Sequence, residues 1–282
     1  MAGSDIRHGA AVVVAAAVVL MSAAAATAAP DPGVYGRLTG TGPSDERWRP
    51  RPGLTWQWQL DGRLDTTVRA KVYDIDGFTT SRSLVRRLHR LGRKVVCYID
   101  AGAWESWRPD ADRFPPVVLG KVNPQWPDQR WLDVRRIDVL GPIMVDRLRM
   151  CARKRFDGVE LDEVDGYSND TGFPLRARHQ LRYNRFLARQ TRRLGLAAGL
   201  KNDLEQVGAL VERFDFAVNE QCFQYRECRS LRPFIRARKA VFHVEYHVPR
   251  HRFCPTTTRL GFSSMKKHLD LRRWRRPCPS RG

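Results

Sequence analysis

The sequence of 282 residues lacks several patterns that mark common classes of protein. It has only seven histidines, and its six cysteines show none of the close pairs of a zinc site. No glycine-rich phosphate loop follows the first predicted strand, which argues against an open nucleotide-binding sheet. We therefore expect no catalytic metal and no cofactor.

Long apolar runs are also absent, except for residues 9–26. Arg7 and His8 precede this run, and the small residues 26–28 follow it, as at a signal-peptidase site. A membrane anchor is the alternative, but the run is short, rich in Ala and not followed by a basic stop. We predict a signal peptide at 1–28 and a secreted protein with no membrane contact after cleavage.

The six cysteines fit an oxidising compartment, where disulfides are the default. Cys222 and Cys228 are close enough to staple one loop, and Cys254 with Cys278 would tie down the C-terminal tail. Cys97 lies on a predicted strand and is expected to be buried. Six cysteines allow 15 pairings, so the sequence leaves their connectivity open.

The charge is strongly basic, with 50 Lys and Arg against 30 Asp and Glu and a net charge of +20. This balance raises the possibility of a nucleic-acid or polyanion partner. However, the basic residues lie mostly on outer faces of predicted helices, as for Arg86 and Arg90, so we expect a solvated surface and no nucleic-acid partner. The basic tail at 266–282 is the best candidate for a polyanion or cell-wall contact.

After a Pro-, Gly- and Arg-rich entry segment at 29–53, short β-rich runs alternate with amphipathic helical stretches. This rhythm is typical of βα units around a parallel sheet. Eight strands in about 230 residues favour a single (β/α)8 TIM barrel at 54–265. The predicted strands are 55–60, 70–76, 94–100, 158–162, 197–202, 216–220, 240–246 and 257–262. The predicted helices are 81–91, 137–155, 175–194, 204–214, 228–237 and a short last helix at 263–271.

Six consecutive predicted strands end in charged or polar side chains. A single Asp at a strand end is more often the N-cap of the next helix. In a barrel, however, all the strand ends converge on one ring, where like charges repel. A ligand site therefore explains the whole set better than stability does. The residues are Asp74, Asp76, Asp100, Asp162, Glu163, Asp165, Lys201, Asn202, Glu220, Glu245 and Tyr246.

Two carboxylates facing one another across such a ring suit glycosidic cleavage. One carboxyl group must be protonated so that it can donate a proton to the leaving oxygen. The other must be ionised so that it can attack the anomeric carbon or activate water. Aromatic residues near the strand ends, including Tyr98 and Tyr246, suit the apolar faces of sugars. Ordinary core packing is the alternative for each aromatic residue.

At these strand ends the sequence resembles glycoside hydrolase family 114, the endo-α-1,4-polygalactosaminidases. The matching stretches follow the family's order from about residue 54 to 247. They include Phe-Asp-Gly-Val-Glu-Leu-Asp at 156–162, Gly-Leu-Lys-Asn at 199–202 and Val-Asn-Glu-Gln-Cys at 218–222. The resemblance implies a (β/α)8 barrel that hydrolyses α-1,4-linked galactosamine polymers with retention.

The resemblance also implies roles for individual residues. Asp162 would be the nucleophile and Glu220 the general acid/base. Substrate contacts are implied for Asp74, Asp100, Asp165, Lys201 and Glu245, to which the aromatic argument adds Tyr98 and Tyr246. One departure is Glu163, where the family commonly has Asn, and this extra carboxylate puts the exact substrate in doubt.

The expected partner is an amino-sugar polysaccharide, bound by a monomer. A partly deacetylated polymer is cationic, as is the protein, so attraction must come from the local ring of carboxylates. Three alternatives remain: a polysaccharide-binding barrel without this activity, a hydrolase of another α-linked glycan, and a secreted polyanion-binding protein.

Overall fold

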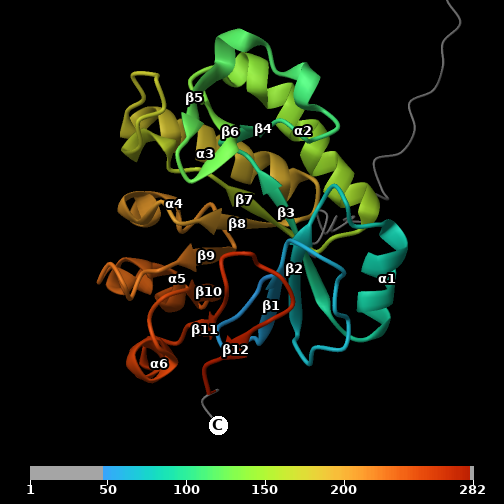
Figure 1. The fold of residues 1–282 in the computed structure, drawn as a ribbon, viewed down its shortest axis with the longest axis vertical. Helices are drawn as coiled ribbons and strands as arrows, with labels where there is room; N and C mark the ends of the chain where they lie inside the picture. Colours follow the sequence, from blue (N-terminus) through green and yellow to red (C-terminus); the bar gives the residue numbers. More distant parts are fainter. Residues whose placement is uncertain (1–46, 280–282) are drawn as a thin grey trace, which may run out of the picture. The chain divides into compact units, whose positions relative to one another are not determined.

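The structure is a computed structural model that describes residues 47–279. The predicted signal peptide and most of the predicted entry segment lie outside these residues. The described part is built around one curled sheet, in which eight strands run parallel to their neighbours (Figure 1). In sheet order they are β1 (Trp56–Gln59), β2 (Val72–Asp76), β3 (Lys94–Asp100), β7 (Gly158–Asp162), β8 (Ala197–Lys201), β9 (Phe216–Glu220), β10 (Val241–Glu245) and β11 (Ser263–Lys266).

A seam lies between the first and the last of these strands. A ninth strand, β12 (Arg276–Pro277), pairs antiparallel with β11, and no backbone ladder joins β1 to β11 within residues 47–279. Instead, Trp56 Nε1 donates to the Ser263 carbonyl (2.8 Å), and Leu60 N donates to the Leu271 carbonyl (3.1 Å). The predicted α/β class is therefore confirmed as a curled, mainly parallel sheet, without a complete ring of paired strands in this part of the chain.

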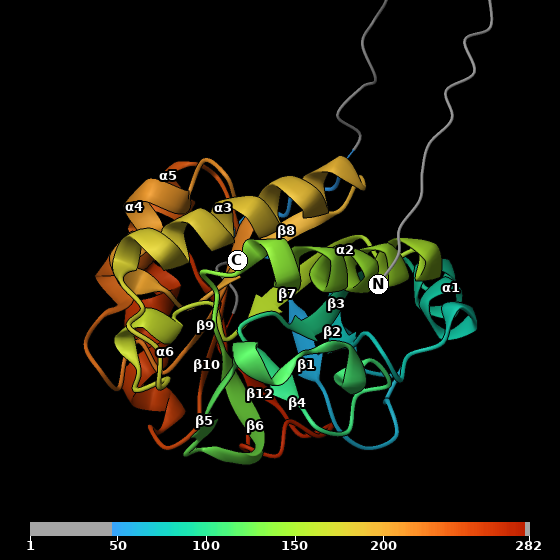
Figure 2. The same cartoon turned by 90° about the horizontal axis from the view of Figure 1, so that it is seen from above.

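Helices cover the outer face of the sheet, and α2 and α3 lie side by side in Figure 2. Ser81 caps the first helix by accepting from Leu84 N (3.2 Å), and Val85 and Leu88 form its buried stripe. The helices are α1 (Arg82–Arg90), α2 (Ile137–Lys154), α3 (Ala177–Arg193), α4 (Val207–Leu210), α5 (Arg232–Arg236) and α6 (Arg250–Arg259). Single 3₁₀ turns lie at η1 (Ala111–Arg113), η2 (Pro116–Val118), η3 (Gly166–Ser168), η4 (Leu204–Gln206) and η5 (Cys228–Leu231).

The alternation of side chains along the strands divides the core into two clusters. Residues such as Ile75 and Val159 pack toward the helices. A second cluster, which includes Trp58, Phe216 and Phe242, fills the interior of the curled sheet. Because the period is two, every second residue of a strand points into this interior, including those at the carboxyl end.

A small antiparallel sheet between β3 and α2 was not predicted. Its strands are β4 (Ala103–Glu105), β5 (Leu119–Asn123) and β6 (Trp126–Leu132), in the order β4-β6-β5. This insertion brings Asn123 to Glu163, with 3.3 Å between the amide nitrogen and a carboxylate oxygen. It therefore contributes to the surroundings of the carboxyl end of β7.

The predictions for the C-terminal elements were wrong. Residues 257–259 belong to α6, not to a strand, and the eighth parallel strand is β11, where a helix was expected. Three consecutive threonines suggested a strand, but the Thr257 hydroxyl donates to the Phe253 carbonyl one turn back (3.2 Å). Ser264, near the predicted helix cap, instead contacts buried His243 at 3.0 Å.

Three disulfides link the six cysteines. The pairs Cys222–Cys228 and Cys254–Cys278 were the expected candidates. Cys97, expected only to be buried, pairs with Cys151 and joins β3 to α2. The bond to Cys278 and the strand β12 build the predicted basic tail into the fold. Within residues 47–279, no helix is long and apolar enough to cross a membrane.

Candidate active site

The predicted catalytic pair meets at a single buried lysine. Lys201 Nζ, at the end of β8, lies 2.8 Å from Asp162 Oδ1 and 2.9 Å from Glu220 Oε2. It also lies 3.6 Å from Glu160 Oε1 and 5.0 Å from the ring centre of Trp58. The neighbouring strands β7, β8 and β9 thus bring two carboxylates and one ammonium together at the same edge of the sheet.

Lys201 keeps its charge in this setting. Burial of the side chain works against the ammonium form. The three neighbouring carboxylates outweigh burial and hold the pKa of Lys201 well above its usual value. A permanent cation therefore stands between the members of the predicted pair.

Asp162 is oriented by three donors. Tyr98 Oη donates to Oδ2 (2.8 Å), while Lys201 Nζ and the backbone amide of Glu163 both donate to Oδ1 (2.8 Å each). Glu163 adopts a left-handed backbone conformation (φ 55°), which directs its amide back toward Asp162. A carboxylate held in this way is fixed in direction, as a nucleophile requires.

Glu220 has two side-chain partners. Tyr246 Oη donates to Oε1, and Lys201 contacts Oε2. Its backbone amide donates to Asn202 Oδ1 (3.1 Å), which fixes the end of β9. Burial and the charge of Glu220 raise the pKa of Tyr246 well above its usual value, so this phenol remains a donor.

A second carboxyl pair, Asp74 and Glu160, lies deeper in the sheet interior, with exposed fractions of 1% and 0%. No N–H or O–H group of the described residues donates to their oxygens. Burial raises the pKa of Asp74 to about 7, although the adjacent Glu160 carboxyl group and the charge of Lys201 act in the opposite direction. Burial and then the charge of Asp74 raise the pKa of Glu160 well above its usual value. The two groups therefore share at least one proton near neutral pH.

More acidic groups surround the mouth of the site. Burial and the charge of Asp162 raise the pKa of Asp165 to about 6 and that of Glu163 well above its usual value. Burial and the charge of Asp165 raise the pKa of Asp203 to about 8. These shifts identify a crowded carboxyl cluster, which is the environment that separates acid from base roles.

Asp100 and Glu245 bind backbone amides. Asp100 is fully buried and accepts from Ala103 N (2.6 Å), which anchors the turn after β3. Glu245 Oε1 accepts from Phe223 N (2.8 Å) and lies 3.0 Å from His243 Nε2. Since Val244 and Tyr246 point into the sheet interior, Glu245 lies on its outer side, beneath the loop that follows Glu220.

Asp76, also at a strand end, belongs to a separate ion cluster. Arg108 Nη1 donates to Asp76 Oδ2 (2.6 Å), and Arg108 Nε donates to Glu105 Oε2 (2.6 Å). This guanidinium neutralises both carboxylates and ties the end of β2 to the loop after β3. The cluster stabilises the local structure rather than facing Lys201.

Sequence reasoning did not assign roles to Glu160 and Asn202. Asn202 was noted only among the strand-end residues, and the signal for Glu160 is its period-two spacing from Asp162, which places both side chains on one face of β7. Trp58, on β1, is a further residue beside the site. It is 1% exposed, and its ring faces the Lys201 ammonium.

One cluster of possible metal ligands is found within residues 47–279, formed by Cys222, Cys228 and His243. The two cysteines are joined in a disulfide, so they offer no thiolate to a metal. The site around Lys201 pairs its carboxylates with an ammonium instead. The chemistry of this arrangement is that of acid, base and nucleophile.

Comparisons with known proteins identify the family of the chain. The sequence model of the glycoside-hydrolase family GH114 matches residues 39–281, whereas no curated protein sequence matches the chain. The chain is similar to the crystal structure of Aspergillus fumigatus Ega3 in complex with galactosamine. The two share 36% identity with a TM-score of 0.79, over 82% of this chain and 97% of Ega3.

A more distant likeness concerns the fold. The glycoside hydrolase domain of PelA from Pseudomonas aeruginosa has 13% identity and a TM-score of 0.61, over 77% of this chain and 95% of that domain. The resemblance inferred from the strand ends is confirmed by the family match and by Ega3. The chain belongs to the glycoside-hydrolase family GH114 and is a glycoside hydrolase.

Proposed function

We propose that this enzyme cleaves α-1,4-linked galactosamine-containing polysaccharide by a retaining mechanism, with Asp162 as the nucleophile and Glu220 as the general acid/base. The observation that carries the proposal is the contact of both carboxylates with Lys201 Nζ, at 2.8 and 2.9 Å. The family match and the galactosamine bound to Ega3 support the class of substrate.

The spacing of the pair favours retention. Because one nitrogen touches an oxygen of each carboxylate, these two oxygens lie less than about 6 Å apart. Retaining enzymes place their carboxyl groups roughly 5–5.5 Å apart, whereas inverting enzymes need roughly 6.5–9.5 Å to admit a water. This spacing supports a direct attack of Asp162 on the anomeric carbon.

The hydrogen bonds divide the roles. Three donors orient Asp162, which supports its role in forming the bond to the anomeric carbon while Glu220, in its acid form, gives a proton to the leaving oxygen. In this step bound substrate displaces Lys201 from Glu220. In the second step Glu220 takes a proton from water, which attacks the anomeric carbon and releases Asp162. This proton restores the acid form of Glu220 with which the first step began.

The other predicted contacts divide into two groups. Tyr98, Tyr246 and Lys201 contact the proposed catalytic pair, and we propose that they position the sugar together with Asp165. Asp74, Asp100 and Glu245 are buried at 1% exposure or less, and we propose that they act through the residues they hold. Carboxylates near the mouth, including Glu163 and Asp165, attract the ammonium group of a deacetylated sugar.

The cellular setting is part of the proposal. Three disulfides fit an oxidising compartment, so we propose an extracellular monomer that is exported by a signal peptide at 1–28. We also propose that the curled sheet is a (β/α)8 barrel spanning 54–265, in which the segment after β11 closes the seam between β1 and β11. The contacts of Ser263 and Leu271 with β1 support this closure.

The test is the release of reducing ends from partly deacetylated α-1,4-galactosamine polymer. Asp162→Asn and Glu220→Gln keep the shape of each side chain and remove the charge. We expect each variant to lose about 10³-fold or more in kcat while its thermal unfolding stays cooperative. NMR of the first-formed anomer checks retention.

Two results would contradict the proposal. If wild-type enzyme leaves this polymer intact but cleaves another α-linked glycan, the substrate is wrong and the carboxylate pair stands. If either folded variant keeps the wild-type rate, the assigned pair is wrong.

A further inference from the structure

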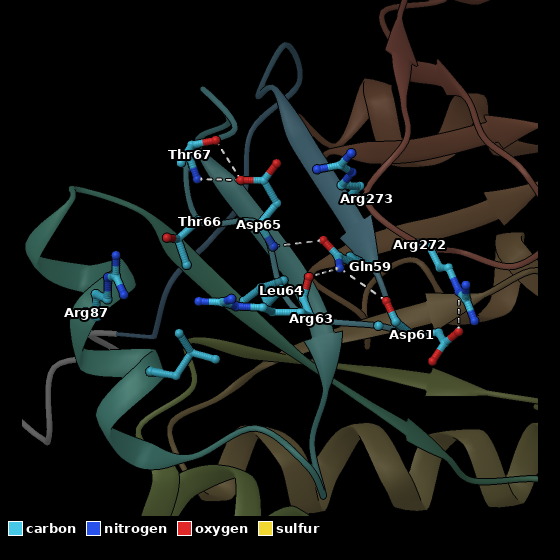
Figure 3. A pocket seen from close by; sticks show the side chains of 12 residues that line it. Gln59, Asp61, Arg63, Leu64, Asp65, Thr66, Thr67, Arg87, Arg272 and Arg273 are labelled. Atoms are coloured by element: carbon cyan, nitrogen blue, oxygen red, sulfur yellow. Dashed lines mark hydrogen bonds and ion pairs between the residues drawn. The ribbon is translucent and has the colours of Figure 1, made fainter.

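A pocket of about 890 Å³ lies apart from the carboxylate site (Figure 3). Its walls are the loop after β1 at residues 61–67, helix α1 and the segment after β11. None of its lining residues belongs to the site around Lys201. The pocket lies where β1 and β2 are joined by a loop without a helix, next to the seam of the sheet.

Both acidic residues of the pocket already have partners. Asp61 Oδ2 accepts from Arg272 Nε (2.7 Å). Asp65 Oδ1 accepts from the backbone amide (2.9 Å) and the hydroxyl (2.6 Å) of Thr67. The Thr67 contacts and the charge of Arg273 lower the pKa of Asp65, so both aspartates carry charge, but the four arginines of the lining still outnumber them.

Three further arginines line the same pocket: Arg63, Arg87 and Arg273. Within residues 47–279, no side-chain hydrogen bond or ion pair is found for their guanidinium groups. Figure 3 shows the side chain of Arg63 extending from its loop toward α1, which carries Arg87. Cations from three elements that share one hollow repel one another unless an anion lies between them.

Buried polar groups hold two of these arginines in place. Gln59, which is 4% exposed, donates to the Arg63 carbonyl (3.0 Å) and fixes the loop after β1. Gln57, which is 0% exposed, donates to the Arg273 carbonyl (3.0 Å) across the seam. The pocket is therefore preorganised, since the backbone positions of its cations do not depend on a ligand.

We propose that this pocket binds an acidic oligosaccharide through its carboxylate groups. Guanidinium groups match carboxylates in a bidentate geometry. The volume is in the range of roughly 300–1,000 Å³ that accommodates small organic ligands and exceeds the size of a single ion. Leu64 and Leu84 supply apolar wall beside the arginines, as the mixed surface of a sugar requires. The inference does not depend on the catalytic assignment.

The test is isothermal titration of full-length enzyme with trigalacturonate, a uronate trimer, and with neutral galactotriose. The pocket variant is Arg63→Gln/Arg87→Gln. Its matched control is Arg86→Gln/Arg90→Gln, which removes the same charge from exposed positions of α1 outside the pocket. We expect wild type and control to bind the uronate with equal affinity, and the pocket variant to bind it about tenfold or more weakly. Reducing-end release from galactosamine polymer stays unchanged in both variants.

Several outcomes would overturn the proposal. Equal weakening in the control variant would show a diffuse charge effect, and equal binding of galactotriose would exclude carboxylate recognition. Unchanged binding in the pocket variant would place the uronate elsewhere. Duplex DNA is tested as a competitor as well: if it displaces the uronate from wild type, and if DNA binding is lost in the Arg63→Gln/Arg87→Gln variant, the pocket is a general polyanion site.

Discussion

Four carboxyl groups and one ammonium share the interior of the sheet around Lys201. If all were ionised, the single cation would face four anions in a setting with little water. The raised pKa values of Asp74 and Glu160 show how the charge is balanced, because the deeper pair keeps at least one proton. Asp162 and Glu220 are nearer to solvent, with side-chain exposures of 14% and 24%, and both contact the Lys201 ammonium directly.

The buried Asp74 carboxyl makes stability depend on pH. The folded-state pKa of Asp74, about 7, lies above its ordinary value of 3.8. The stability that its protonated form contributes is therefore fully present below pH 3.8 and is lost as pH rises through 7. Asp74→Asn removes this pH-dependent loss of stability. We expect the free energy of unfolding of the variant, relative to wild type, to rise by ~2–3 kcal/mol from pH 5 to pH 8.

Urea unfolding at the two pH values measures this difference. Asp112→Asn, at an exposed aspartate, serves as the control and should follow wild type at both pH values. Parallel pH dependence of wild type and Asp74→Asn would show that Asp74 is ionised in the folded protein.

At the scale of elements, the loop after β9 positions the proposed acid/base. Glu245, which is 0% exposed, accepts from the Phe223 amide beneath this loop. Glu245→Ala leaves that amide unpaired, whereas Glu245→Gln keeps an acceptor oxygen. We expect the alanine variant to lose about 10–100-fold in kcat with a smaller change in KM, since small displacements of a catalytic group are costly.

Steady-state kinetics on the polymer separate kcat from KM for both variants. Glu245→Gln is the control for shape and should keep most of the wild-type kcat. A direct substrate contact predicts a different pattern, in which KM rises in both variants while kcat is kept.

The elements also show what the sequence could specify. Strands 94–100, 158–162 and 216–220 have the predicted bounds, because each is an apolar run ending in charged residues. The end of α6 was misassigned because Thr257 has strand propensity, while its buried helical position is set by Phe253 and Cys254. Tertiary contacts of this kind are not visible in a local pattern.

Long-range features of the site were only partly accessible. The position of Asp162, Lys201 and Glu220 at predicted strand ends grouped them correctly, since parallel strands end at one edge of the sheet. It did not distinguish residues facing inward from those facing outward, as for Glu245, because the phase of the alternation depends on the register. The Cys97–Cys151 bond spans 54 residues and joins a strand to a helix, so spacing gave no indication of it.

At the scale of the molecule, two opposite electrostatic effects act on a cationic substrate. The net charge of +20 repels it at long range, while the carboxyl cluster at the mouth attracts it at short range. Salt screens the distant charges first, because the Debye length falls from about 30 Å at 0.01 M to about 10 Å at 0.1 M. The balance between repulsion and attraction should therefore change with ionic strength.

We expect kcat/KM on deacetylated galactosamine polymer to rise between 0.01 and about 0.1 M NaCl, as repulsion at long range is screened, and to fall at higher salt, as the attraction at the mouth weakens. Initial rates across a NaCl series at constant pH measure this profile. A fully acetylated polymer, which is neutral, is the control if it is cleaved and should give a flat profile. A steady fall of kcat/KM from the lowest salt would mean that attraction by the carboxyl cluster exceeds repulsion by the net charge at every distance. The surface arginines would then not oppose substrate association.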